Sequence, residues 1–188
     1  MTNPDEIVEA IEAAEEQKEV AKIVEYVELA SSHGGDEDWA EAAEASLDAL
    51  YRLVKGGSAE PSLSYLKSVL KTLTSWKEEE AIVEVGLGCV VAIASKAKED
   101  NDNPEDAAAV DVGLVVQLMK DFADEATIQE QACLAMEGLA IWKASWKTAL
   151  ASQEGIQEEL GQARDSRITN ERNKSYPVRA AKALGMEL

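Results

Sequence analysis

An amphipathic helical pattern recurs along this chain at nearly constant intervals. The stretch TIQEQACLAMEGLA, residues 127–140, matches in pattern the stretch AIVEVGLGCVVAIA, which lies 46 residues upstream. The same register joins Leu50, Ile93, Leu139 and Leu184 at intervals of 43, 46 and 45 residues. One agreement between two amphipathic helices can arise by chance. Four positions in order, with similar helices preceding them, predict an internal repeat.

The remaining segments also follow the helical period. Apolar residues recur every three to four positions, and no segment shows sustained two-residue alternation, so we expect an all-α protein. Glycine, proline and polar clusters separate the helices. The predicted helices cover residues 5–29, 39–54, 63–76, 81–97, 104–112, 114–122, 127–142, 146–153, 156–162 and 177–188.

Residues 104–142 carry the most regular unit. A short helix, EDAAAVDV, is ended by Gly113, and a second helix, LVVQLMKDF, is followed by a turn and the long helix TIQEQACLAMEGLA. This order resembles a complete armadillo repeat. The resemblance implies a right-handed α-solenoid of about four repeats in a single domain, residues 1–188. The approximate units are 5–55, 61–98, 104–143 and 146–188, with the N-terminal helix as a candidate cap. HEAT repeats remain an alternative for residues 1–100.

The resemblance also indicates where a partner would bind. In armadillo arrays the third helices line a concave groove, and peptide-binding members carry tryptophan and asparagine there, four residues apart. The asparagine positions fall here on Ala49, Ala92, Gly138 and Ala183, and the tryptophan positions on Ala45, Gly88, Leu134 and Arg179. The asparagine ladder is therefore absent, and small residues rimmed by acids take its place. Tight packing between adjacent repeats would explain the small residues equally well. The predicted contact residues are Asp48, Glu84, Glu130, Gln131, Leu134, Glu137, Gly138, Trp142 and Trp146.

Two of these residues, Trp142 and Trp146, lie four apart and would share one face of a helix. They are either packed between one repeat and the next helix or partly exposed as an aromatic anchor for a partner.

The net charge of −19, from 18 basic and 37 acidic side chains, argues against binding to nucleic acid or to an anionic membrane. Residues 162–188 are the exception, with a net charge of +3. Their six cations are either a site for an acidic partner or the counter-charges of neighbouring acids, and we favour the second. No apolar run is long enough to enter a membrane. The acidic N-terminus lacks the order of a signal peptide, so we expect an intracellular location, cytoplasmic or nuclear.

No catalytic, cofactor or metal motif is recognisable. The polar stretch KEDNDNPED has part of the spacing of a calcium loop, but Glu105 stands where that loop requires glycine, so we interpret it as a loop between helices. His33 is the only histidine, and no catalytic group can be assembled around it. Cys89 and Cys133 have apolar neighbours and are predicted to be buried hydrophobic residues.

We therefore expect a non-catalytic scaffold or adaptor that binds a protein or peptide, preferably a basic one, through an acidic concave surface. The alternative is a structural subunit or assembly factor held permanently in a larger complex.

Overall fold

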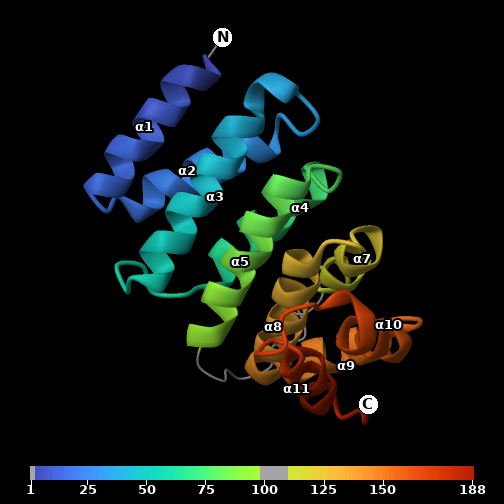
Figure 1. Ribbon diagram of the computed structural model, residues 1–188. Helices are drawn as coiled ribbons and strands as arrows, with labels where there is room; N and C mark the ends of the chain where they lie inside the picture. The colour runs from blue at the N-terminus through green and yellow to red at the C-terminus, as the bar shows by residue number, and fades with distance from the viewer. Residues whose placement is uncertain (1–2, 98–109) are drawn as a thin grey trace. The chain divides into compact units, whose positions relative to one another are not determined.

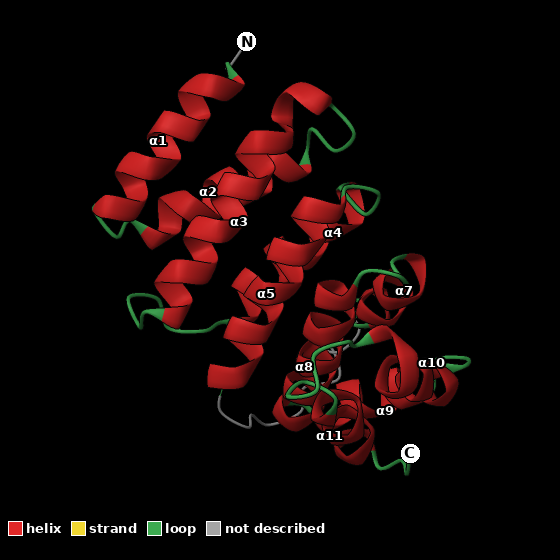
Figure 2. Cartoon of the chain, viewed as in Figure 1, coloured by secondary structure: helices red, strands yellow, loops and turns green. Residues whose placement is uncertain are grey.

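The computed structural model describes residues 3–97 and 110–188, and all regular structure in these residues is helical (Figures 1 and 2). The predicted all-α class is confirmed. The chain forms two compact units, Met1–Lys96 (unit 1) and Ala97–Leu188 (unit 2). Each unit is described by itself. The loop and most of the helix predicted for residues 98–112 lie outside the described residues.

Unit 1 contains five α-helices and one short 3₁₀-helix. They are α1 (Pro4–Glu16), α2 (Val20–Ser31), η1 (Glu37–Trp39), α3 (Ala40–Lys55), α4 (Leu63–Ser75) and α5 (Glu80–Lys96). Side-chain oxygens cap two of the helices, because the first N–H groups of a helix have no partner within it. The side chain of Asn3 accepts a hydrogen bond from the N–H of Asp5, and that of Ser62 accepts one from Tyr65.

The single helix predicted for residues 5–29 is wrong, because the chain turns between α1 and α2. Lys18 adopts a φ of 57°, which a helix cannot accommodate. The apolar pattern shifts at the same point. Ile7, Ile11 and Ala14 are buried in α1, but continuing their period would place Lys18 and Glu25 in the core. The chain turns, and α2 then buries a new stripe that begins at Ile23.

Helix α4 holds α2 and α5 together in unit 1. Two of its polar groups donate to backbone oxygens of α2: the Thr72 hydroxyl to Val27, and the Trp76 indole N–H, from the residue that ends α4, to Ala30. On its other side, α4 approaches α5 so closely that a Cβ on Gly86 would lie 2.5 Å from Leu73. Helix α5 also packs on α3. The core between these helices includes the fully buried side chains of Leu47, Leu50, Leu66, Leu73, Ile82 and Leu87.

Unit 2 contains five α-helices in its described part. They are α7 (Gly113–Asp121), α8 (Ala126–Trp142), α9 (Ala144–Ala151), α10 (Ile156–Gln162) and α11 (Ser175–Leu184). These bounds agree with the predicted helices to within two residues at most ends. Helix α11 is the exception, because it ends at Gly185, whose φ of 82° is left-handed. Glycine commonly ends helices in this conformation.

Helix α8 lies at the centre of unit 2 and packs against α7, α9 and α11. Residues around most of its circumference are buried, whereas α11 buries a single stripe formed by Pro177, Ala180, Ala181 and Leu184. The segment between the helices predicted at residues 156–162 and 177–188 is polar in sequence but partly helical in the structure. It begins as a π-helical turn, η2 (Ala163–Arg167), and its Ile168 is fully buried.

Candidate functional site

The predicted contact residues fall on four helices. Six of them share α8: Trp142, which is buried, and five half-buried residues, Glu130, Gln131, Leu134, Glu137 and Gly138. Trp146 lies on α9. The other two acids belong to unit 1, Asp48 on α3 and Glu84 on α5. The structure thus gathers six candidates on one helix of unit 2.

The acids of α8 are already engaged by the chain's own C-terminal residues. Glu137 forms a salt bridge with Arg179 of α11, with nitrogen–oxygen distances of 3.0 and 2.7 Å. Glu130 accepts a hydrogen bond of 2.8 Å from the side chain of Asn173. The charge of Glu137 is paired, and one oxygen of Glu130 is occupied by a neutral amide donor, so Glu137 in particular offers less attraction to a cationic partner than its sequence position suggests.

Other cations of residues 162–188 behave in the same way. Arg167 pairs with Glu159 at 2.5 Å, Arg164 with Asp165 and Lys174 with Glu171. The interpretation that this basic segment neutralises neighbouring acids is therefore confirmed for four of its six cations.

The two acids of unit 1 have different surroundings. Asp48 lies 2.9 Å from Arg52, which also contacts Glu15 of α1. Glu84 is exposed, and it takes part in none of the ion pairs found in the described residues. Of the two, only Glu84 is free to meet a partner's charge.

Of the two alternatives for Trp142 and Trp146, the structure shows packing, and their placement among the predicted contact residues is not supported. Both indoles are buried, with ring centroids 5.2 Å apart in an edge-to-face arrangement. They close the junction between α8 and α9, and the alkyl chain of buried Lys143 brings its ammonium group within 5.7 Å of the Trp146 ring. The packing alternative accounts for them, because an aromatic anchor must be accessible before a partner arrives.

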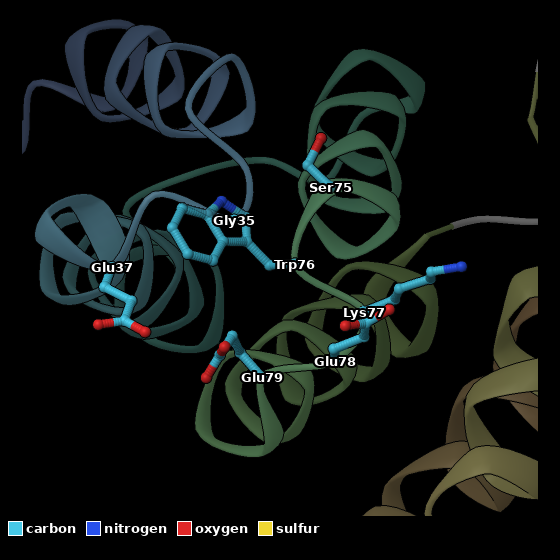
Figure 3. Close-up of a pocket in the computed structure, with 7 residues that line it drawn as sticks. All are labelled: Gly35, Glu37, Ser75, Trp76, Lys77, Glu78 and Glu79. Atoms are coloured by element: carbon cyan, nitrogen blue, oxygen red, sulfur yellow. The ribbon is translucent and has the colours of Figure 1, made fainter.

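A pocket that was not predicted lies in unit 1, where two loops meet (Figure 3). Gly35 and Glu37 come from the segment between α2 and α3, whereas Ser75, Trp76, Lys77, Glu78 and Glu79 come from the end of α4 and the turn before α5. In Figure 3 the Lys77 side chain extends away from Trp76, which is buried with 2% of its surface exposed. The indole is fixed by its bond to Ala30, and the three glutamates are exposed.

Helix α1 carries a second acidic feature. Its exposed side includes Asp5, Glu9, Glu12 and Glu16, whose spacing of four, three and four residues places them in one stripe. No basic residue occurs in α1. We call these four residues the α1 stripe. Their spacing can be read from the sequence, but the armadillo resemblance predicted the contact surface on the third helices instead.

The cysteine and histidine side chains, which are among the types that most often perform catalysis, are unfavourably placed for it. Burial, with a smaller contribution from Asp48, raises the pKa of Cys89 far above its usual range, and burial beside Glu130 does the same to the pKa of Cys133. His33 is stacked on Trp39 with a centroid distance of 3.8 Å. In residues 3–97 and 110–188, no three His, Cys, Asp or Glu side chains are grouped to hold a metal ion. Within the same residues no helix combines the length and apolar character needed to span a bilayer.

Comparisons with protein-family models, with curated proteins and with solved structures found no match. The armadillo resemblance therefore stays a prediction from the sequence.

Proposed function

We propose that this chain is a non-catalytic protein-interaction module, a scaffold or adaptor, which binds a basic segment of a partner protein through the acidic surface of unit 1. One observation carries the proposal. Unit 1 has 20 acidic and 8 basic side chains, and among its described residues only Glu15, Glu19 and Asp48 take part in ion pairs. In unit 2, in contrast, both acids among the predicted contact residues are engaged, Glu130 by a hydrogen bond from Asn173 and Glu137 by its salt bridge with Arg179.

An uncompensated surface of this kind has an energetic consequence. Like charges one helical turn apart destabilise a helix by about 0.2–0.5 kcal/mol per pair at low salt. The α1 stripe contains two such i,i+4 pairs, Asp5–Glu9 and Glu12–Glu16. A basic segment bound along α1 would remove this repulsion. The negative electrostatic potential of these acids would also speed its encounter with the protein.

The pocket of Figure 3 offers a place to fix such a segment. Its rim carries three exposed carboxylates around the buried Trp76, which closes the pocket from within unit 1. The proposed contact surface therefore consists of the α1 stripe and the pocket rim formed by Glu37, Glu78 and Glu79.

The repeat architecture belongs to this proposal as well. In unit 1, α3 packs on α5, and in unit 2, α8 packs on α11. These are the helices whose pattern recurs at intervals of 43 to 46 residues, and their side-by-side packing within each unit supports an armadillo-like array. In such arrays each repeat buries its apolar face against its neighbour and leaves an extended surface for binding.

The test uses the full chain and a fluorescently labelled peptide that alternates lysine with serine. Binding is followed by anisotropy at low and at moderate salt. We expect the double variants Glu9→Gln/Glu12→Gln and Glu78→Gln/Glu79→Gln each to weaken binding several-fold. The control, Glu154→Gln/Glu158→Gln, removes the same charge from exposed residues of unit 2 and should change binding little.

Equal weakening by all three variants would mean that only the overall charge attracts the peptide, and the proposed surface would be abandoned. Tight binding of an uncharged serine peptide would contradict the electrostatic basis of the proposal.

A further inference from the structure

Unit 2 exposes two large apolar side chains, and no others are exposed in the described part of the chain. Ile141, at the end of α8, has 61% of its surface accessible, and Val178 of α11 has 44%. Single exposed apolar residues need no explanation, but these two lie on helices that pack against each other.

Ile141 lines a hollow of about 390 Å³ together with Glu137, Arg179, Lys182 and Ala183. Val178 precedes Lys182 by one turn of α11 and shares its helix face, but it is not among the residues that line the hollow. The hollow is lined by Ile141, by the methyl group of Ala183 and by the aliphatic parts of the two cationic side chains.

The charges around the hollow are unequal. Glu137 and Arg179 neutralise each other through their salt bridge. Lys182 is exposed and forms none of the ion pairs found among residues 3–97 and 110–188. The hollow therefore combines an apolar wall with one positive charge that none of those ion pairs compensates. Lys182 belongs to residues 162–188, whose net charge is +3.

We propose that this hollow docks an acidic–apolar segment of a partner protein, with one apolar side chain against Ile141 and a neighbouring carboxylate on Lys182. The partner's chemistry follows from complementarity, because a basic segment would meet Lys182 with like charge. This inference is independent of the proposed function: it concerns the other unit and the opposite charge preference.

A second copy of this chain fits the hollow less well. Its most acidic helix, α1, keeps Ile7 and Ile11 buried and so has neither side chain free to enter the hollow. A partner of different sequence is therefore the occupant to which the proposal commits.

The test is a selection from a phage-displayed library of random peptides on the immobilised full chain. We expect enriched peptides to carry an apolar residue next to Asp or Glu. The strongest of them, made synthetically, should bind Ile141→Ser and Lys182→Glu about tenfold or more weakly than the unchanged protein. It should bind Arg172→Glu equally well, because Arg172 is an exposed cation of the same segment that does not line the hollow.

Ile141 and Lys182 are exposed, so both variants should keep the circular dichroism spectrum and the unfolding midpoint of the parent. Enrichment of basic peptides would overturn the proposal. So would enriched peptides that bind Ile141→Ser and Arg172→Glu alike, or failure to enrich any peptide over the Ile141→Ser/Lys182→Glu double variant. Light scattering that reveals a dimer abolished by Ile141→Ser would show that a second copy occupies the hollow.

Discussion

Gln129 links three parts of unit 2, and its replacement is the most demanding test of the local structure. The residue is fully buried in α8, and its amide donates to the carbonyl oxygens of Met119, at 2.6 Å, and Phe122, at 2.9 Å. These carbonyls lie at the end of α7, where the helix itself no longer supplies donors. The amide oxygen of Gln129 also accepts from Arg167 at 3.4 Å.

We expect Gln129→Met, which keeps the volume and removes the amide, to destabilise unit 2 by about 2–3 kcal/mol. Each lost hydrogen bond contributes about 0.5–1.5 kcal/mol, and the buried Met119 carbonyl loses a donor that solvent does not replace. Phe122 is less affected, because its oxygen also accepts from the N–H of Glu125.

Native-state hydrogen exchange measures this loss in the unit where it occurs. Amides of α7 and α8 should exchange roughly 30-fold faster or more in Gln129→Met. The control is Gln131→Met, on the same helix but half-exposed and without a hydrogen bond to α7, which should change exchange less than about twofold. Equal effects of the two variants would refute the assignment of Gln129 as the link between α7 and α8.

Three further predictions concern packing, charge and thiol chemistry. Gly86→Ala should lower stability by about 1–3 kcal/mol, because its Cβ would lie 2.5 Å from Leu73. Gly161→Ala in α10 meets no atom within 4 Å and should raise stability by about 0.5–1 kcal/mol. Denaturant unfolding measures both changes. Glu9→Gln/Glu12→Gln should raise the thermal midpoint at low salt, and the gain should shrink at high salt; a gain unchanged by salt would exclude relief of charge repulsion. Burial raises the pKa values of Cys89 and Cys133, so at pH 8 both stay protonated thiols and should react with a thiol reagent only after denaturant is added; rapid labelling of the native protein would contradict their burial.

Helical periodicity predicted most of the helices, because the apolar residues of each helix recur at a constant helical spacing along one face. Helix α10 begins and ends at the predicted residues, α4 and α8 differ from the prediction by one residue at one end, and α5 differs by one residue at each end. The error at Lys18 arose because α1 and α2 are each strongly periodic, and the prediction ignored the shift of phase between them. The sequence contained that shift.

The candidate site was predicted less well, for a different reason. Whether an acid is free depends on which cation the fold brings near it, and Arg179 follows its partner Glu137 by 42 residues. Periodicity identifies the face on which a residue lies but not the residue opposite.

The segment that follows α10 offers a practical use. Arg167, Ile168 and Asn173 fasten it to the rest of unit 2, whereas residues 169–172 between these anchors are exposed. Chain added to an exposed loop is inexpensive, since doubling a loop's length costs only about 0.6 kcal/mol of closure entropy. An epitope or a fluorophore-binding tag inserted after Asn170 would therefore report on this protein in a cell without altering any residue that lines the hollow at Ile141.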